Sequence, residues 1–251
     1  MARQRLGQHF LIRGSILERI ARSACLETEP LVIEIGPGRG ALTAHLLARA
    51  ERVVAIEIDP YLASYLERKF TAKGSLEVVQ GDATEIDLIR WGPAVIAGNL
   101  PYYAAGAILE RVVRLGGGLK RAVFLVQKEA AERAAAAPRS RDYGYFSVAL
   151  QFFADVELLF DVPPAAFHPP PKVDSAVVRL TPRDRRAELG ITDPSAFLDF
   201  VSLCFRHKRK TLRNNLADVY GSQVDAWPEA GLRAEQVNIE MFADLYRRLV
   251  P

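Results

Sequence analysis

The sequence predicts an α/β fold with a mostly parallel sheet, an antiparallel last strand and a small all-helical C-terminal domain. Over the first two thirds of the chain, short apolar strand-like runs alternate with helical patterns of about 10 to 12 residues. This alternation is typical of βαβ units, in which helices cover both faces of a parallel sheet. After Pro182 the pattern changes to amphipathic helices.

The predicted elements of the sheet domain follow one another in strand–helix order. Strands are expected at 31–35, 52–58, 75–79, 94–98 and 121–127, and helices at 40–50, 61–70, 104–115 and 128–137. Two later strands, at 156–162 and 173–181, are separated by a proline-rich loop without a helical pattern. Because a parallel crossover needs a long connection, we expect this pair to add an antiparallel end to the sheet.

A change of pattern near residue 183 predicts two domains, 1–182 with the sheet and 183–251 with helices only. Apolar side chains between 194 and 206 recur at the spacing of an amphipathic helix, and 241–249 repeats the pattern. The first of these stripes consists of Phe197, Phe200, Val201, Cys204 and Phe205.

Composition and charge are those of an ordinary globular protein. The 251 residues are 49% hydrophobic, with a formal net charge of +3. No apolar run is long enough for a transmembrane helix, and the basic N-terminus lacks the apolar segment of a signal peptide. Two distant cysteines, Cys25 and Cys204, suggest reduced thiols, so we expect a cytoplasmic protein. Four scattered histidines argue against a metal site, and the lack of a long apolar stripe argues for a monomer.

A glycine-rich turn follows the first predicted strand in Glu34-Ile-Gly36-Pro-Gly38-Arg-Gly40. Glycines allow the backbone to approach a ligand closely, and the N-terminus of the next helix favours a polar ligand. Seventeen residues after Gly40, Glu57 closes the second strand, where a carboxylate can accept hydrogen bonds from two ribose hydroxyls. Gly36, Gly38 and Glu57 therefore predict a nucleoside-cofactor site, although a tight turn followed by a solvated acid is the simpler alternative.

The spacing of the glycines distinguishes two classes of cofactor. Dinucleotide-binding folds usually show GxGxxG, whereas this turn is GxGxG with an acid two residues earlier. It resembles motif I of Rossmann-like, class I S-adenosylmethionine (SAM) methyltransferases. Asp82 follows the third strand, where such enzymes have an acid that accepts the adenine amino group of the cofactor.

The fourth strand ends in Gly98-Asn-Leu-Pro-Tyr-Tyr103, which has the groups needed to methylate the exocyclic amine of adenine. That amine is a poor nucleophile, because its lone pair is delocalised into the ring, so a catalyst must accept its hydrogen bonds and align it. The Asn99 side-chain oxygen and the Leu100 carbonyl can act as acceptors, Pro101 fixes the turn, and the Tyr102 ring can stack on the base. No strong general base is needed, since the methylated product can lose its proton to water.

Taken together, these motifs resemble the KsgA/RsmA family of ribosomal RNA adenine dimethyltransferases, which are relatives of the Erm methylases. The resemblance covers nearly the whole chain: GQHFL at 7–11, EIGPGRGALT at 34–43, AIEID at 55–59, GDA at 81–83, NLPYY at 99–103, VQKE at 126–129, FHPPPKVDS at 167–175 and FRHKRKTLRNNL at 205–216. It implies dimethylation of two adjacent adenines in the 3′-terminal hairpin of small-subunit (16S) ribosomal RNA during assembly of the 30S particle.

The resemblance also implies roles for particular residues. It implies cofactor contacts from His9, Leu11, Gly36, Glu57, Asp82 and Asn99. It implies that Phe167 lies on the face of the target adenine opposite Tyr102, so that a flipped base would be held between two rings. A core aromatic beside the proline-rich loop is the alternative for Phe167. His9 replaces an asparagine that is frequent in the family.

A basic segment of the C-terminal domain suggests RNA binding. If this segment is helical, Arg206, Arg209, Lys210 and Arg213 share one face, with Lys208 nearby. No acid interrupts the run, which favours phosphate contact over a solvated basic helix. Arg139 and Arg141, from a flexible basic loop of the family, are expected to add to this surface.

Three other functions fit parts of these observations. An Erm-type enzyme that methylates large-subunit RNA has the same motifs. A non-catalytic RNA-binding assembly factor fits the basic segment. A nicotinamide-dependent oxidoreductase fits the sheet, but it would need GxGxxG and a site for hydride transfer.

Overall fold

The computed structural model describes residues 9–70 and 74–249, which form two compact units. The first unit contains the sheet and ends at Pro182, although Glu132–Ala154 is excluded from it. Those residues join the chain from Arg183 onwards in a second, helical unit. The second change of unit, at residue 183, lies near the boundary expected from the sequence. The sequence pattern did not indicate that Glu132–Ala154 belongs to the helical unit. Gly7 and Gln8 of the N-terminal motif lie outside the described residues.

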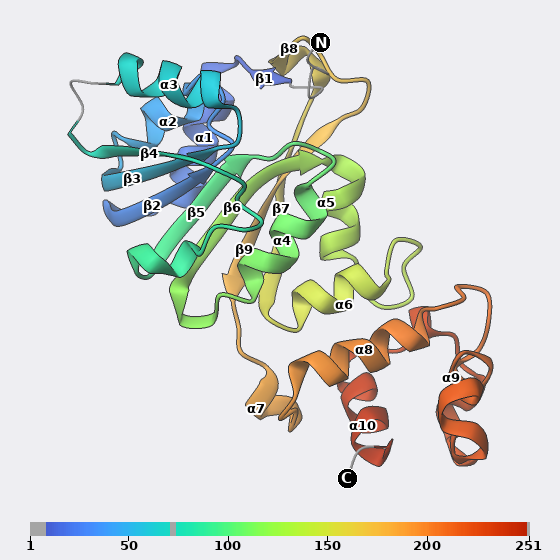
Figure 1. Ribbon diagram of the computed structural model, residues 1–251. Coiled ribbons are helices and arrows are strands. Elements are labelled where there is room, and N and C mark those ends of the chain that lie inside the picture. The colour runs from blue at the N-terminus through green and yellow to red at the C-terminus, as the bar shows by residue number, and fades with distance from the viewer. Residues whose placement is uncertain (1–8, 71–73, 250–251) are drawn as a thin grey trace. The chain divides into compact units, whose positions relative to one another are not determined.

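A seven-stranded sheet in the order β4-β3-β2-β5-β6-β9-β7 forms the frame of the first unit (Figure 1). Strands β2 to β6 pair in parallel, and β9 pairs antiparallel with β6, which confirms the predicted mixed sheet. Two short strands, β1 and β8, form a separate antiparallel pair. The strands are β1 (Phe10–Leu11), β2 (Glu29–Ile35), β3 (Ala50–Glu57), β4 (Leu76–Gln80), β5 (Ala94–Asn99), β6 (Leu119–Gln127), β7 (Ala154–Val162), β8 (Phe167–His168) and β9 (Ser175–Pro182).

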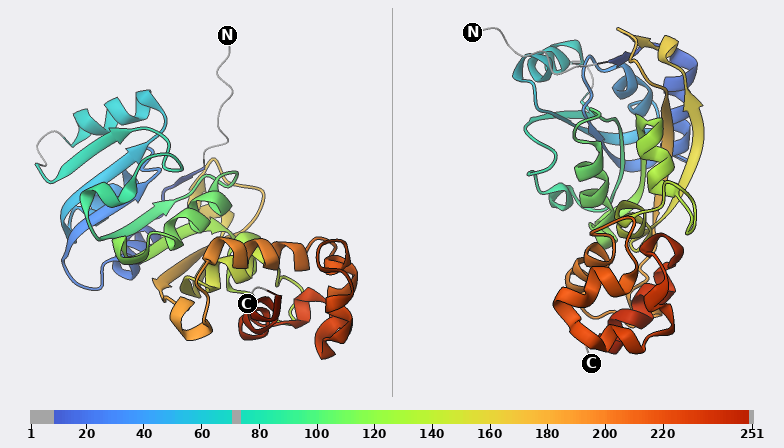
Figure 2. Two further views of the ribbon diagram at one scale, coloured as in Figure 1. Left: turned by 60° about the horizontal axis from the view of Figure 1, so that its bottom comes forward. Right: turned by 90° about the vertical axis from the view of Figure 1, so that its right-hand side faces the viewer.

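Helices cover both faces of this sheet (Figures 1 and 2). Helices α1 (Gly14–Ala24) and α2 (Ala41–Leu46) pack on one face, where Leu17 and Ile20 meet Val95 and other strand residues in one core. Side chains alternate along a strand, so the buried Ile96 faces the opposite side, which α4 (Ala105–Val113) covers. Helix α5 (Lys128–Ala135) follows β6.

The turn from β3 into α3 (Pro60–Lys69) shows how the sequence sets an element boundary. Asp59 accepts hydrogen bonds from the backbone N–H groups of Tyr61 and Leu62, and Pro60 occupies the first helical position. The strand therefore ends at Glu57, with the carboxylate beside the start of this turn. Helix α1 is absent from the predicted elements because it begins at Gly14 without a side-chain cap.

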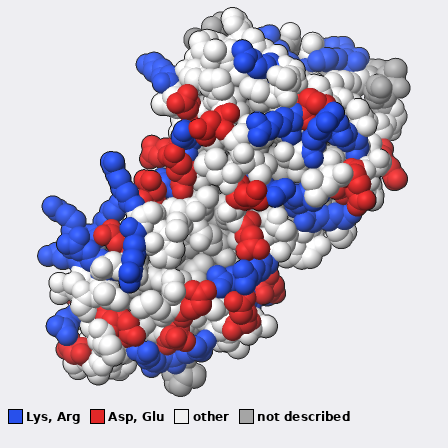
Figure 3. Space-filling view, turned by 180° about the vertical axis from the view of Figure 1, so that it is seen from behind, with Lys and Arg blue, Asp and Glu red and all other residues white. Residues whose placement is uncertain are grey.

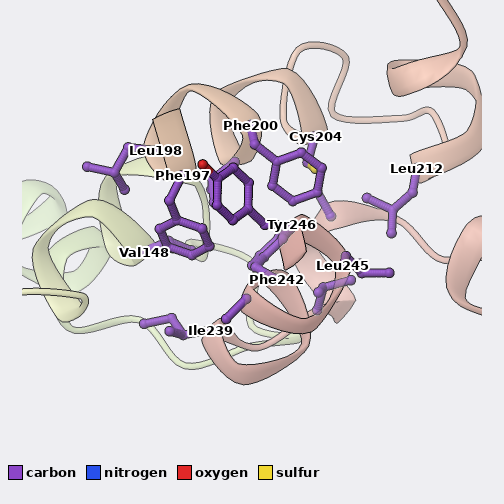
Figure 4. Packing of buried hydrophobic residues seen from close by; sticks show 14 of the residues in the cluster. Val148, Phe197, Leu198, Phe200, Cys204, Leu212, Ile239, Phe242, Leu245 and Tyr246 are labelled. Atoms are coloured by element: carbon purple, nitrogen blue, oxygen red, sulfur yellow. The ribbon is translucent and has the colours of Figure 1, made fainter. Parts of the chain in front are cut away.

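The second unit has its own aromatic core (Figure 4). Its helices are α6 (Tyr145–Gln151), α7 (Arg186–Leu189), α8 (Pro194–Cys204), α9 (Leu212–Tyr220) and α10 (Ile239–Leu249). The Phe197 ring is central, with ring centroids of Phe152 and Tyr246 at 4.9 and 5.6 Å. Two of these helices, α8 and α10, correspond to the amphipathic patterns at 194–206 and 241–249. Cys25 and Cys204 are both buried free thiols.

Candidate active site

The first unit contains a cavity of about 490 Å³ at the carboxyl ends of the parallel strands. Strands β2, β3 and β5 end there at Ile35, Glu57 and Asn99, and the loop after β4 adds Asp82. Parallel strands bring their carboxyl ends to one edge of a sheet, so motifs far apart in the sequence meet at this edge. This explains why the predicted cofactor and amine-binding residues line one cavity.

The glycine turn and Glu57 are joined directly. Gly36 and Gly38 have backbone φ angles of +69° and +57°, which L-residues with side chains rarely adopt. The Gly38 N–H donates to Oε2 of Glu57, and the Asp59 N–H donates to Oε1, both at 3.0 Å. Burial raises the pKa of Glu57, and these two hydrogen bonds partly oppose the rise. A carboxylate has about four acceptor positions, so Glu57 keeps capacity for two ribose hydroxyls.

Glu34, the acid that precedes the glycine turn, is a buried group of a different kind. Its side chain is 1% exposed and accepts a hydrogen bond of 2.5 Å from the Thr43 hydroxyl of α2. Burial raises the pKa of Glu34 to about 8, and the hydrogen bond from Thr43 opposes this only in part. Glu34 is therefore mainly protonated at neutral pH, and it ties β2 to the helix that follows the turn.

Asp82 uses one of its carboxylate oxygens inside its own loop. Both the backbone N–H and the hydroxyl of Thr84 donate to Oδ1, each at 2.7 Å. The loop is also held from α4, since Arg111 donates to the carbonyl of Ile86 at 2.7 Å. Among the described residues Oδ2 of Asp82 has no hydrogen bond from a side chain or backbone group, so it can accept from an amine in the cavity.

Gly98 brings the GNLPYY segment close to the glycine turn. A Cβ at this position would lie 2.3 Å from the Ile35 carbonyl oxygen of β2, so any side chain would force the strands apart. The next residue, Asn99, donates from Nδ2 to the His9 carbonyl at 3.2 Å. With the nitrogen used in this way, the Asn99 Oδ1 atom is the acceptor that remains for a substrate amine. Pro101 accepts the Ala104 N–H at 3.0 Å and closes the turn before α4.

Tyr102 is held at both ends of its side chain. Its hydroxyl forms a hydrogen bond of 2.8 Å with the hydroxyl of Ser175, a fully buried residue at the start of β9. Its ring lies alongside the His9 imidazole, with centroids 5.9 Å apart and planes 29° from parallel. Burial raises the pKa of Tyr102, so the phenol stays neutral at physiological pH. The ring is thus a fixed flat surface, not a proton acceptor.

Phe167 does not face Tyr102 in this structure. Its side chain is 3% exposed, belongs to the core cluster under α1, and is not among the residues that line the cavity. The backbone of Phe167 pairs with Leu11, so β8 holds the N-terminal segment in a two-stranded antiparallel sheet. The sandwich of Tyr102 and Phe167 that the family resemblance implies is therefore not formed, and His9 lies beside Tyr102 instead.

The N-terminal segment closes one side of the cavity. His9 and Leu11 both line it, and the His9 Nδ1 atom lies 2.8 Å from the Pro169 carbonyl. Phe10 packs directly on the glycine turn, because a Cβ at Gly38 would lie 3.0 Å from its ring. Neither Phe10 nor Ser175 is among the site residues expected from the sequence. Phe10 lies inside the GQHFL motif, which could have indicated it, whereas Ser175 is 73 residues away from its partner Tyr102.

The basic residues of the second unit lie on two loops and the start of α9, not on one helical face. Residues 205–211 connect α8 to α9 without helical structure, and of the predicted set only Arg213 is in a helix. Arg206 and Arg213 form ion pairs with Asp218 at 3.7 Å and Asp225 at 2.7 Å. The Lys208 ammonium donates to the Arg141 carbonyl at 3.2 Å, which joins the two basic loops.

Several of these cations remain open to a ligand. Arg209 and Lys210 are exposed and form no ion pair with a described residue. Arg139 is also exposed, and its backbone is left-handed (φ +71°). The Arg139 N–H donates a hydrogen bond of 2.7 Å to the Glu235 carbonyl, which holds this conformation. Over most of the face in Figure 3, Lys and Arg alternate with Asp and Glu, so basic character is local.

The described residues include no cluster of three or more His, Cys, Asp or Glu side chains that could hold a metal ion. In the same part of the chain, no helix has the length and apolar character needed to cross a membrane.

The cavity fits a nucleoside cofactor by its chemistry. Its volume is in the range of small-molecule sites, Glu57 and Asp82 both retain acceptor capacity, and Gly36 and Gly38 expose backbone to the cavity. A sheet of this order with this site defines a class I SAM-dependent methyltransferase.

Residues 1–249 match the family "Ribosomal RNA adenine dimethylase", and the chain belongs to this family.

Individual relatives agree with this assignment. The chain is 43% identical to Ribosomal RNA small subunit methyltransferase A of Acidobacterium capsulatum, with 98% of this chain and 90% of that protein covered. It is 42% identical to the protein of the same name from Gloeobacter violaceus, with coverage of 98% and 93%. Among solved structures, a dimethyladenosine transferase from Plasmodium falciparum has a TM-score of 0.79 at 25% identity, covering 96% of each chain. The 23S rRNA methyltransferase ErmE has a TM-score of 0.73 at 29% identity, covering 96% of this chain and all of its own.

Proposed function

We propose that this enzyme transfers methyl groups to the N6 amines of two adjacent adenines in the 3′-terminal hairpin of small-subunit ribosomal RNA. The observation that carries the proposal is the fixed amide of Asn99, whose nitrogen donates to His9 and whose oxygen remains as an acceptor in the cavity. Proteins named for the small subunit are 42–43% identical to this chain, whereas ErmE is 29% identical. These values favour the small-subunit substrate over the large-subunit one.

One group of cavity residues is proposed to bind the cofactor. When bound, SAM supplies an electrophilic methyl group. Glu57 accepts hydrogen bonds from the ribose hydroxyls, and Asp82 accepts from the adenine amine of the cofactor. The backbone of the glycine turn contacts the remaining polar groups of the cofactor. His9 and Leu11 cover this site from the N-terminal segment.

The acceptor side of the cavity orients the target base. Asn99 Oδ1 and the Leu100 carbonyl accept hydrogen bonds from the N6 amine, which favours the lone-pair geometry needed for attack. Tyr102 stacks on the base and restricts its orientation. The neutral phenol does not take up the proton, so the proton of the methylated amine passes to water. Phe167 would have to leave its buried position to form the second wall that the family resemblance implies.

The second unit is proposed to bind RNA phosphates. Arg209, Lys210 and Arg139 are exposed, and Arg141 and Lys208 join the two loops that carry them. Arg206 and Arg213 would exchange their pairing with Asp218 and Asp225 for phosphates. Each phosphate contact releases counterions, so we expect RNA affinity to fall steeply with salt concentration. We further propose that the enzyme acts as a cytoplasmic monomer on an immature 30S particle.

Methylation assays with the two subunits test this function directly. The purified protein with labelled SAM should methylate small-subunit RNA or immature 30S particles and leave large-subunit RNA unmodified. Mass mapping of ribosomal RNA from cells that lack the protein should show two adjacent adenines without methyl groups. Label in large-subunit RNA alone would assign the enzyme to the Erm-type reaction, and no label in either would favour a non-catalytic assembly factor.

A further inference from the structure

Tyr103 is an exposed aromatic residue at the cavity that the proposed chemistry does not use. It is 69% exposed and lines the cavity directly after Tyr102, in the turn that precedes α4. No hydrogen bond or ring contact holds it among the described residues. Exposure alone is ordinary for a surface tyrosine, so what matters is where this exposed ring lies.

Two observations separate Tyr103 from other exposed apolar residues. Nine large hydrophobic side chains are exposed in the described part of the chain, and Tyr61 and Tyr103 are the aromatic ones. Tyr61, on α3, is 64% exposed and does not line the cavity. Tyr103 therefore combines an exposed ring with a position at the cavity that Tyr61 lacks. Ile12, which is 61% exposed, also lines the cavity and adds to an apolar rim.

We propose that Tyr103 is a stacking platform for the unpaired RNA nucleotide next to the target adenine. The proposal rests on the proposed function, in which an adenine enters the cavity beside Tyr102. The Tyr102 hydroxyl is anchored inward on the buried Ser175, while the next ring along the chain is exposed to solvent. Two consecutive rings with these opposite environments suit two consecutive bases, one inside the cavity and one at its mouth.

The chemistry of the surface favours RNA over a protein partner. An aromatic ring stacks on any base without base-specific hydrogen bonds, so one ring can stack on whichever nucleotide lies beside the target. Extruding an adenine also leaves its neighbour without a stacking partner on one side. Tyr103 replaces that lost stacking at the mouth of the cavity, and so lowers the cost of base extrusion for a strand in the correct register.

The test compares Tyr103→Ala and Tyr103→Phe with Tyr61→Ala, a matched control with similar exposure. The substrate is a small-subunit RNA hairpin with 2-aminopurine either at the target adenine or at the nucleotide beside it. We expect the Tyr103→Ala enzyme still to bind the RNA hairpin, but with a KM for RNA roughly 5- to 100-fold above that of the wild type. Quenching of the probe beside the target should be lost, while quenching at the target position is retained. Tyr103→Phe and Tyr61→Ala should behave like the wild type, and SAM affinity should be unchanged in all three.

Several outcomes would overturn the proposal. A wild-type KM for Tyr103→Ala, or undiminished quenching of the neighbouring probe, would show that this base does not stack there. A loss in Tyr103→Phe equal to that in Tyr103→Ala would assign the effect to the hydroxyl group and not to stacking. If the wild-type enzyme itself fails to methylate small-subunit RNA or particles, the proposed function fails and this inference fails with it. If the wild type methylates and Tyr103→Ala matches it, only the inference about Tyr103 fails.

Discussion

The side-chain amide of Asn99 donates a hydrogen bond of 3.2 Å to the backbone carbonyl of His9, across 90 positions of sequence. This contact joins the GNLPYY turn to the N-terminal segment that closes one side of the cavity. It also fixes which end of the amide is available to a substrate. In the proposed function, one side chain thus links closure of the cavity to orientation of the target amine.

Two substitutions of Asn99 should separate these roles. Asn99→Ala removes both the acceptor and the donor, so we expect the single-turnover rate of methyl transfer to fall on the order of 10²–10³-fold. Asn99→Asp keeps an acceptor but places a carboxylate against the His9 carbonyl, so it should weaken SAM binding as well as slow transfer. Rapid-quench assays give the rates, and calorimetric titration gives the affinity for SAM. Wild-type SAM affinity in both variants would show that the His9 contact plays no part in closure.

The hydroxyl groups of Tyr102 and Ser175 should act as one unit. Tyr102→Phe and Ser175→Ala each remove one side of a hydrogen bond whose net worth is about 1 kcal/mol, so each should lower kcat/KM by roughly 5- to 10-fold. The double variant should be no worse than either single one, because the shared interaction is already lost. Additive losses would mean that Ser175 supports the fold independently of Tyr102. Ser175→Thr, which keeps a hydroxyl, is the matched control for the kinetic effect.

The sequence was sufficient to predict the sheet, and the residues that it singles out for the cofactor line one cavity, because both depend on local patterns. The glycine turn, Glu57, Asp82 and Asn99 each follow a strand, and the parallel order of strands brings them together. Contacts between distant segments were not accessible in this way. The position of His9 beside Tyr102 depends on pairing of β1 with β8, two strands of two residues each. Such short strands have no periodicity that a pattern can show.

Burial of two side chains, Phe167 and Asn215, changes what the sequence alone had predicted. Phe167 lies in a family motif, but its ring joins the core under α1 and leaves the cavity to His9. The basic segment at 206–213 has helical spacing, but its first part is a loop. Its conformation depends on Asn215, whose side chain is buried and bonded to the backbone of that loop. Neither effect follows from residue types alone.

The raised pKa of Glu34 predicts how stability depends on pH. Burial raises the pKa of Glu34 to about 8 in the folded state, above its ordinary value of 4.5. Between these values the folded state binds more protons than the unfolded state, so this group makes stability fall as pH rises from about 4.5 to about 8. The contribution is complete below pH 4.5 and lost above pH 8. Glu34→Gln, which stays neutral, should show a flatter decline over this interval.

Urea unfolding at a series of pH values measures this effect. The matched control is Glu51→Gln, because Glu51 is exposed on β3 and should leave the pH profile as in the wild type. Thr43→Val should lower stability at all pH values, since the Thr43 hydroxyl donates to Glu34. Parallel pH profiles for the wild type and Glu34→Gln would rule out a titrating Glu34 in this range.

Asn215 organises the basic loop between α8 and α9, and its loss should affect both stability and RNA binding. Its side chain is 2% exposed, donates to the carbonyls of Cys204 and His207 at 2.7 and 3.3 Å, and accepts the His207 N–H at 3.1 Å. Asn215→Ala leaves these backbone groups unpaired, so we expect about 1–3 kcal/mol of destabilisation. Asn214→Ala is the matched control, because the Asn214 side chain is exposed one position earlier on the same helix.

The salt dependence of RNA binding distinguishes an effect on the loop from general loss of folding. If Asn215 positions Arg209 and Lys210, the folded Asn215→Ala protein should bind RNA more weakly, and its slope of log affinity against log salt should be shallower than that of the wild type. Direct removal of one cation in Arg209→Gln should reduce the slope by roughly one unit. An unchanged slope for Asn215→Ala, measured at a temperature where the protein is folded, would mean that the loop binds no phosphates or does not need Asn215 to do so.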